Sequence, residues 1–182
     1  MSAPGPEGWL VVVDLQHVFG DVDSAWGAPR FAEVRPRIRR LVDAFGDRVV
    51  WTRFVAPDRP AGAWTAYYEQ FDFARQPPDA PLYALVEDPG THPVLEATTF
   101  GKWGPELAAI VGDGPLTVAG VATDCCVIST VLPAADAGVP VRVVRDACAG
   151  STDDDHDAAV RIMGLYAPLV AIATTDEVLA GR

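Results

Sequence analysis

Residues 115–127 read PLTVAGVATDCCV, an apolar run that turns within a few residues into the start of a helix. The run Pro115–Val121 is typical of a strand that is covered on both faces of a parallel sheet. Cys125–Ala137 has the pattern of a helix, and Pro133 inside it predicts a kink. A buried strand followed at once by a helix is the repeating unit of α/β folds.

The same alternation of strands and helices continues on both sides of this stretch. The other expected strands are Trp9–Leu15, Arg48–Val55, Val94–Thr99, Pro140–Arg145 and Leu169–Ala173. The other expected helices are Phe31–Phe45, Ala63–Phe73, Pro105–Val111, Asp153–Tyr166 and the terminal turn Thr175–Ala180, whereas the proline-rich Gln76–Pro93 is expected to be mostly irregular. This pattern predicts a three-layer, Rossmann-like α/β fold. Its mainly parallel six-stranded sheet takes the order 3-2-1-4-5-6, with helices on both faces.

Length and composition restrict the class of protein. The 182 residues suit one domain, and we expect a flexible tail over residues 1–8 and a single domain over residues 9–182. A net charge of −11 disfavours nucleic-acid binding, which requires a basic face. The apolar run Trp9–Val13 is far shorter than the ~20 residues of a membrane span, and no basic segment marks it as a secretory signal. We therefore expect a cytoplasmic protein that binds neither nucleic acid nor membranes.

Two reactive side chains are expected at the carboxyl ends of neighbouring strands. Ligands of such folds bind outside these ends, at the point where the strand order reverses. Asp14 ends the first strand, and Cys125 and Cys126 follow the fourth, which lies beside it in the predicted order. Thr123 or Asp124 can cap the helix, so that Cys126 lies in its first turn, where the helix dipole would lower the pKa of the thiol. The sequence therefore predicts a carboxylate and a thiol in one crevice.

These segments resemble a known family, the isochorismatase-like cysteine hydrolases, which include nicotinamidases and N-carbamoylsarcosine amidase. Gly120–Val127 matches the family's nucleophile segment Gly-Val-x-Thr-Asp-x-Cys-Val. The other matching residues are Asp14, Gln16 and Phe19, in the pattern Asp-x-Gln-x-x-Phe, and the later segment Val143–Ala149 followed by His156. The resemblance implies that residues 9–182 are a single isochorismatase-like hydrolase domain.

The resemblance also implies a Cys-Asp-Lys triad that hydrolyses a C–N bond of a small amide-like substrate through an acyl-enzyme. Cys126 would attack the carbonyl, Asp14 would accept the thiol proton, and Lys102 would support the charged states. Backbone N–H groups near Ala122 and Cys126 would form the oxyanion hole. A cis peptide bond between Val121 and Ala122 is the family's usual way of aiming these groups. The family further implies a homo-oligomer.

Lys102 is the only lysine in the chain, which makes it the candidate for the third member of the triad. Its position departs from the family pattern, because counting back from Leu107 by the usual spacing reaches Glu96. Either Lys102 reaches the site from a shifted position, or the triad is altered. An exposed surface lysine is the remaining alternative.

Aromatic residues are the candidates for a substrate pocket. Phe19, Trp26 and Trp103 flank the predicted catalytic residues in sequence, and Gln16 could hydrogen-bond the substrate or the Asp14 region. Further aromatic residues could wall a pocket or fill the core or a subunit interface; these are Trp64, Tyr67, Tyr68 and Phe71. His17, His92 and His156 are too scattered for metal-ligand spacing, so we expect no metal and no other cofactor.

Other functions remain open at this stage. A vinyl-ether hydrolase of the isochorismatase type would share the fold, but such enzymes tend to lack the cysteine found at position 126. A non-catalytic ligand-binding member of the fold would account for the displaced lysine. A thiol redox protein is disfavoured because Cys125 and Cys126 do not have the Cys-x-x-Cys spacing of redox enzymes.

Overall fold

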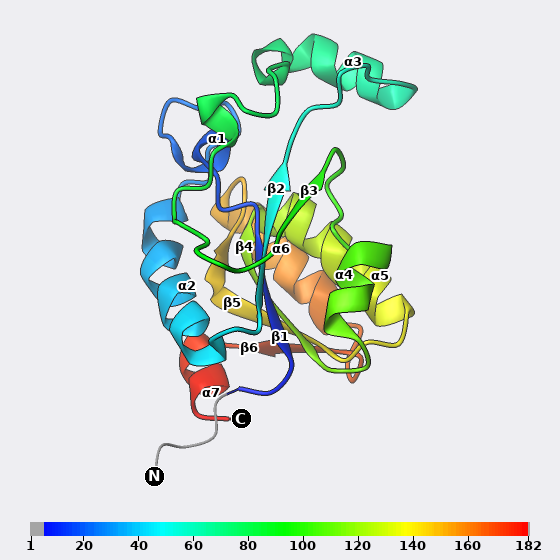
Figure 1. The fold of residues 1–182 in the computed structure, drawn as a ribbon. Helices are drawn as coiled ribbons and strands as arrows, with labels where there is room; N and C mark the ends of the chain where they lie inside the picture. Colours follow the sequence, from blue (N-terminus) through cyan, green and yellow to red (C-terminus); the bar gives the residue numbers. More distant parts are fainter. Residues whose placement is uncertain (1–5, 182) are drawn as a thin grey trace.

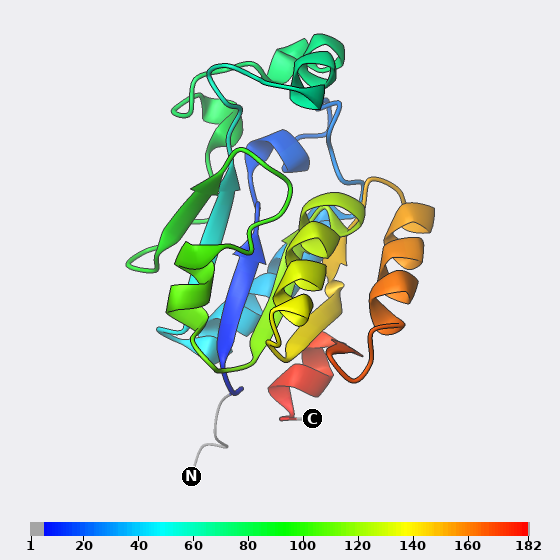
Figure 2. The same cartoon turned by 90° about the vertical axis from the view of Figure 1, so that its right-hand side faces the viewer.

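A parallel sheet in the order β3-β2-β1-β4-β5-β6 forms the middle layer of the protein, for which the computed structural model describes residues 6–181 (Figures 1 and 2). The strands are β1 (Trp9–Val13), β2 (Val49–Phe54), β3 (Val94–Ala97), β4 (Leu116–Val121), β5 (Val141–Ala149) and β6 (Val170–Ala173). Every neighbouring pair is parallel. The predicted fold class and strand order are therefore confirmed.

Helices cover both faces of this sheet. They are α1 (His17–Gly20), α2 (Phe31–Phe45), α3 (Ala63–Gln70), α4 (Pro105–Val111), α5 (Ile128–Asp136), α6 (Asp153–Gly164) and α7 (Thr175–Leu179). Buried side chains of α2 and α7 join one apolar cluster, and those of α4, α5 and α6 join the other. The chain also forms three short helical turns. Two are 3₁₀ turns at Asp72–Ala74 and Pro81–Tyr83, and the third is a wide π-type turn at Thr123–Val127, before α5.

The central strand β1 is apolar at every position because both of its faces are covered. Leu10 and Val12 pack into the cluster under α2, whereas Val11 and Val13 pack into the cluster under α4 and α5. All four side chains are fully buried. Such two-sided burial gives the continuous apolar run that predicted a parallel sheet.

β5 is longer than the predicted strand Pro140–Arg145. Its pairing with β4 shifts between Val118 and Gly120, so that Gly120 pairs with Cys148 and the strand continues past Asp146. Gly120 has a φ of 124°, and a Cβ there would lie 2.1 Å from the Val13 carbonyl oxygen. Only glycine allows this approach of β4 to β1 beside the end of β1.

Several predicted boundaries differ from the structure at the helices. The predicted helix Ala63–Phe73 ends at Gln70, and the short helix α1 was not predicted. The flexible tail predicted over residues 1–8 falls mostly on residues 1–5, which lie outside the described residues. Within the rest of that segment, the Gly8 carbonyl accepts a hydrogen bond of 2.6 Å from Arg48.

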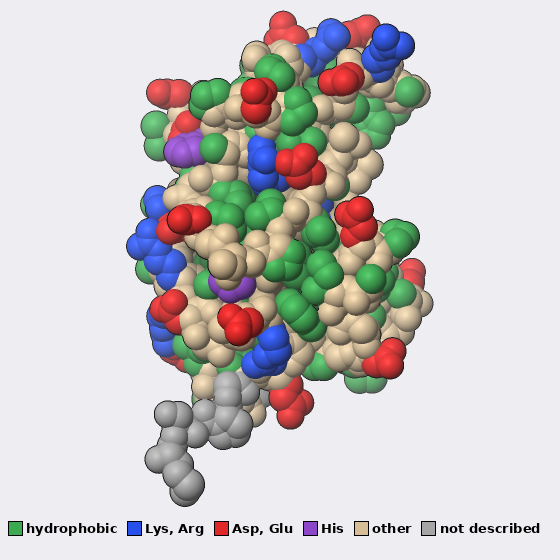
Figure 3. Space-filling model, viewed as in Figure 1, with side chains coloured by type: hydrophobic (Ala, Val, Ile, Leu, Met, Phe, Trp, Pro, Cys, Tyr) green, Lys and Arg blue, Asp and Glu red, His purple; other side chains and the backbone are tan. Residues whose placement is uncertain are grey.

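The surface carries charges of both signs. Basic side chains gather along α2 in Figure 3, and acidic side chains are spread over the same face. Arg35 and Arg39 of α2 both bind Glu87, at 2.6 and 2.7 Å. Within residues 6–181, no helix is both long enough and apolar enough to span a bilayer.

Candidate active site

Asp14 directly follows β1, and its side chain is fully buried. Its φ of 48° is in the left-handed region that side chains other than glycine rarely adopt. Thr52 of β2 holds it there: its hydroxyl accepts a hydrogen bond of 3.1 Å from the Asp14 N–H and donates one of 2.6 Å to Oδ1. Residues in such conformations are concentrated at functional sites. Oδ1 is thereby fixed, and Oδ2 faces a different neighbour.

That neighbour is Lys102, whose Nζ lies 3.0 Å from Asp14 Oδ2. Only 2% of the lysine side chain is exposed, so the two opposite charges compensate each other inside the protein. Nζ also donates a hydrogen bond of 2.7 Å to the Thr99 carbonyl and lies 5.2 Å from the centre of the Phe54 ring. Of the alternatives that the sequence left open, the structure shows the shifted position. The surface-lysine alternative is wrong.

The loop that carries Lys102 is held against α5 and the turn before it. The Lys102 N–H donates to the Thr130 hydroxyl at 2.9 Å, and that hydroxyl donates to the Cys126 carbonyl at 2.7 Å. A Cβ on Gly101 would lie 2.5 Å from the Ser129 carbonyl oxygen, which belongs to the helix backbone. The loop therefore reaches this position only because residue 101 is glycine.

Gly101→Ala is expected to push the loop away from α5 and to lower turnover by about 10- to 100-fold, since a displacement of ~1 Å at a catalytic group has effects of this size. Gly104→Ala is the matched control, because a Cβ at Gly104 meets nothing within 4 Å and its backbone is extended. The measurement is kcat for the amide hydrolysis that the resemblance implies, together with thermal unfolding of both variants. Equal turnover in the two variants would show that the loop position does not matter.

Cys126 lies in the turn before α5, and only 2% of it is exposed. Burial raises the pKa of its thiol well above the usual value, and the Asp14 carboxylate raises this pKa further, against the opposing effect of Lys102. The lowered pKa predicted from the helix dipole is therefore wrong, since burial and a neighbouring negative charge outweigh the dipole. At rest, the site holds a thiol beside a carboxylate.

The predicted helix cap is also wrong, because no side chain caps this turn. The Thr123 hydroxyl instead lies 2.8 Å from His156 Nδ1. Asp124 accepts two hydrogen bonds of 2.8 Å from Ser151, one from its N–H and one from its hydroxyl. These contacts tie the turn to α6 and to the loop before it.

The peptide bond between Val121 and Ala122 is cis, as the resemblance implied. The Ala122 carbonyl accepts hydrogen bonds from the N–H groups of Cys125 and Val127, at 3.1 and 3.0 Å. Ala122 and Cys126 both line a cavity at the carboxyl edge of the sheet. The two residues expected to form the oxyanion hole therefore lie on one wall of it.

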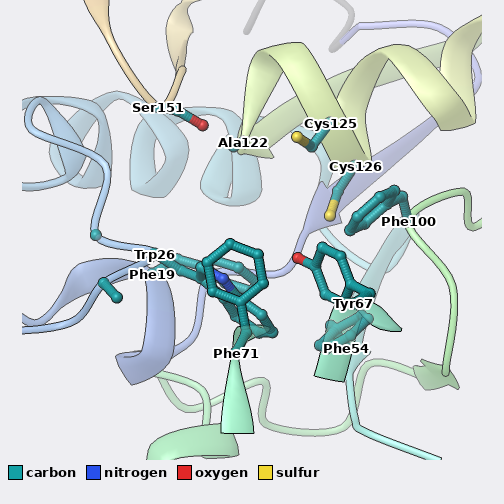
Figure 4. Close-up of a pocket in the computed structure, with 12 residues that line it drawn as sticks. Phe19, Trp26, Phe54, Tyr67, Phe71, Phe100, Ala122, Cys125, Cys126 and Ser151 are labelled. Carbon is teal, nitrogen blue, oxygen red and sulfur yellow. The ribbon is translucent and has the colours of Figure 1, made fainter. Parts of the chain in front are cut away.

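A cavity of about 450 Å³ opens over the carboxyl ends of β1, β2 and β4 (Figure 4). Its lining residues are Phe19, Ala25, Trp26, Gly27, Phe54, Tyr67, Phe71, Phe100, Ala122, Cys125, Cys126 and Ser151. Six of these side chains are aromatic, and none carries a charge in its usual protonation state at pH 7. Cavities of this size and composition bind small molecules.

Two of the four residues predicted to bind substrate lie in this cavity, namely Phe19 and Trp26. Gln16 does not line it, because its buried side chain is bound to the backbone of Phe54 and Tyr83 at 2.7–2.9 Å. Trp103 also lies outside, packed against the apolar cluster under α4 and α5. The structure thus corrects the predictions for Gln16 and Trp103.

Phe54, Phe100 and Ser151 also line the cavity, although none of the three was predicted to do so. Phe54 ends β2 and Ser151 follows β5, so the rule that ligands bind at the carboxyl ends of strands could have indicated both. Phe100 lies in an irregular loop and gave no such signal. Tyr67 and Phe71, which the sequence left open between pocket and core, line the cavity.

Metal-ligating side chains do not gather anywhere in the part of the chain that the structure describes. Among residues 6–181, no group of three or more His, Cys, Asp or Glu side chains could hold a metal ion. The segment after β2, residues 55–60, contributes Asp58 as its one side chain of these types. The absence of a cofactor stays a prediction.

Comparison with known proteins gives a family match and several structural matches. The family model of the isochorismatase domain matches residues 8–177. A search of curated proteins finds no match. A cysteine hydrolase from Pseudomonas syringae pv. phaseolicola has a TM-score of 0.82 and 19% identity, over 99% of this chain and 97% of that one.

Two further solved structures are similar over nearly the whole chain. Pyrazinamidase of Pyrococcus horikoshii, solved in complex with zinc, has a TM-score of 0.74 and 23% identity, over 93% of this chain and 99% of that one. Nicotinamidase from Bacillus subtilis has a TM-score of 0.72 and 18% identity, over 90% and 97%. At these identities the likeness shows a shared fold.

Proposed function

Because the chain belongs to the isochorismatase family, we propose that it is a cysteine hydrolase that cleaves a C–N bond of a small amide-like substrate. One observation carries the proposal. The buried Asp14–Lys102 pair, with 3.0 Å between Oδ2 and Nζ, is next to the Cys126 thiol, which lines an apolar cavity. A nucleophile thus lies in the wall of a small-molecule site, and a proton acceptor and a compensating cation are buried behind it.

The first half of the reaction forms an acyl-enzyme. Asp14 accepts the proton of the Cys126 thiol as the sulfur attacks the carbonyl carbon of the amide. The carbonyl oxygen takes up the negative charge, next to the backbone of Ala122 and Cys126. When the C–N bond breaks, its electrons go to the nitrogen, which takes the proton back from Asp14 and leaves as ammonia or an amine.

The second half returns the enzyme to its resting form. A water molecule attacks the thioester carbon and gives one proton to Asp14. The C–S bond then breaks, and the sulfur regains its proton from Asp14 while the carboxylic acid leaves. Lys102 keeps its charge throughout, so the buried site is never left with an uncompensated carboxylate or thiolate.

The raised thiol pKa suits this cycle. A thiol that stays mostly protonated at rest reacts slowly with other electrophiles, and it loses its proton to Asp14 as the sulfur attacks the substrate carbonyl. Asp14 is adjacent to receive the proton, and Thr52 fixes its other oxygen at 2.6 Å. General-base assistance of this kind typically contributes about 10²–10⁴-fold to a rate.

The lining of the cavity suits an uncharged, largely apolar substrate. Its aromatic walls offer no counter-ion for a charged group, and its volume of about 450 Å³ suits a small molecule. The pyrazinamidase and nicotinamidase among the structural relatives are named for amide substrates, which agrees with amide hydrolysis here.

The test is a panel of small uncharged amides incubated with the enzyme and followed by ammonia release. Peptide mass spectrometry of the quenched reaction is expected to show the substrate's acyl group on Cys126 and on no other cysteine. The panel is repeated after chelator treatment and desalting, which is expected to leave turnover unchanged. An acyl adduct elsewhere, or turnover that only added metal restores, would overturn the proposed mechanism.

A further inference from the structure

Tyr67 is a pocket residue that the proposed triad does not use. It belongs to α3, which lies above the carboxyl ends of the strands and apart from the layered body of the fold (Figure 1). In Figure 4, its hydroxyl oxygen points into the cavity toward the Cys126 sulfur. The chain thus places a phenol opposite the nucleophile in the cavity wall.

The Tyr67 ring is held by aromatic neighbours. The distances between ring centres are 4.8 Å to Phe71, 5.2 Å to Trp64, 5.4 Å to Tyr68, and 5.8 Å to both Trp26 and Phe100. These contacts with several edge-on and tilted rings fix the plane and direction of the side chain. The hydroxyl is therefore preorganised, and little conformational entropy is lost when it forms a hydrogen bond.

The Tyr67 hydroxyl has no hydrogen-bond partner among the described residues, as is also true of the Tyr68 hydroxyl on the same helix and of the Trp26 indole N–H in the cavity wall. Two other hydroxyl groups nearby are occupied. Ser151, also in the cavity wall, donates its hydroxyl proton to Asp124 at 2.8 Å. Tyr83, in the adjoining core, donates to the Ala74 carbonyl and accepts from the Ala56 N–H. Tyr67 thus keeps a free O–H that faces the place where the reaction creates negative charge.

Burial raises the pKa of Tyr67, and the nearby thiols Cys125 and Cys126 raise it further. The phenol is consequently neutral at any physiological pH and keeps its proton to donate.

Building on the proposed function, we propose that Tyr67 is a further catalytic residue, whose O–H donates a hydrogen bond to the Cys126 sulfur when Asp14 takes the thiol proton. The proton of the thiol moves to the carboxylate, and Tyr67 keeps its own. The neutral thiol accepts a hydrogen bond only weakly, whereas the negatively charged thiolate accepts one strongly. The interaction therefore strengthens as charge develops, which is the condition for lowering a barrier rather than only binding a ground state.

Three other titratable groups bear on the Cys126 sulfur, and they act in both directions. Asp14, at the end of β1, and the adjacent Cys125 raise the thiol pKa, whereas Lys102, in the loop before α4, lowers it. On this proposal Tyr67, from α3, acts in the same direction as Lys102. A thiolate would then be stabilised by Tyr67 from within the cavity and by Lys102 from behind its wall.

Tyr67→Phe tests the proposal because it keeps the ring and removes only the hydroxyl. The measurement is the alkylation rate of each cysteine by iodoacetamide between pH 7 and 10, resolved by peptide mass spectrometry. Cys126 is expected to react about three- to tenfold more slowly in the variant, since a thiolate loses a hydrogen bond and its greater nucleophilicity only partly offsets this. Tyr68→Phe is the matched control. Tyr68 lies on the same helix and has a buried hydroxyl without a partner, but it does not line the cavity.

The sign of the change separates this role from a purely steric one. Removing the hydroxyl enlarges the cavity, so a space-filling role predicts faster alkylation of Cys126. An unchanged or faster rate in Tyr67→Phe, or an equal loss in Tyr68→Phe, overturns the proposal. Where an amide substrate is turned over, kcat is expected to fall by a similar factor with KM unchanged, and a rise in KM alone would also overturn it.

Alkylation needs no hydrolysis, so the two proposals fail separately. If Tyr67→Phe slows alkylation while no amide in the panel is cleaved, the hydrogen bond stands and the proposed function fails. If amides are cleaved through Cys126 while the alkylation rate does not change, the proposed function stands and the role of Tyr67 fails.

Discussion

Cys126→Ala is expected to abolish amide hydrolysis, with kcat lower by roughly 10⁴-fold or more, because the variant has no group that can form the acyl-enzyme. Cys125 also lines the cavity, but it cannot substitute. Its thiol is 3.7 Å from Asp124 Oδ2, and the carboxylates that act on it are Asp124 and Asp155, so it lacks the compensating cation that Lys102 provides for Cys126. The fold is expected to persist, since the substitution removes one buried sulfur atom.

The matched control for this prediction is Cys148→Ala. Cys148 is as buried as Cys126, at 3% exposed, but it lies in β5 and outside the cavity. Both variants lose one buried thiol, so their thermal unfolding should change by similar amounts, and only Cys126→Ala should lose turnover. Ammonia release at substrate saturation gives the comparison. Turnover that survives in Cys126→Ala would leave a non-catalytic or differently organised site as the better interpretation.

Asp14→Asn and Lys102→Met are each expected to lower the free energy of unfolding by about 3–5 kcal/mol, because either change leaves the other charge buried without its partner. Asp14 is fully buried and the Lys102 side chain is 2% exposed, so solvent cannot take over the missing charge. The double variant removes both charges and is expected to regain most of this loss. Each single variant and the double variant should also lose turnover by at least about 10²-fold, since the proton acceptor or its cation is gone.

Urea unfolding of the unmodified protein, the two single variants and the double variant completes a double-mutant cycle. The cycle measures the coupling free energy between the Asp14 and Lys102 side chains. A surface pair provides the comparison: Arg40 and Asp176 are 2.8 Å apart, but their side chains are 54% and 82% exposed. Asp176→Asn should have almost no effect on stability, because solvent already screens this pair. If the losses of unfolding free energy in the two single variants simply add in the double variant, the two charges do not stabilise each other.

The sequence by itself determined the layered fold and one half of the site. The apolar run Trp9–Val13 favoured a strand covered on both faces, and alternating strands and helices leave a small number of sheet orders. Strand order then placed Asp14 and Cys126 at one edge, because both follow strands whose carboxyl ends meet there. Short-range periodicity was sufficient for these predictions, since it reports directly on which side chains are buried.

The tertiary structure alone decided the rest of the site. Lys102 and Phe100 lie in an irregular loop whose path depends on contacts such as that of Gly101 with α5, which no local pattern records. The amide of Gln16 proved to be bound to backbone groups remote in sequence. The pKa of Cys126 rises because burial and Asp14 act on it together, against the prediction from the helix dipole alone. Periodicity tells which residues are buried, but the electrostatics of a site depend on the distances between groups that only the folded chain brings together.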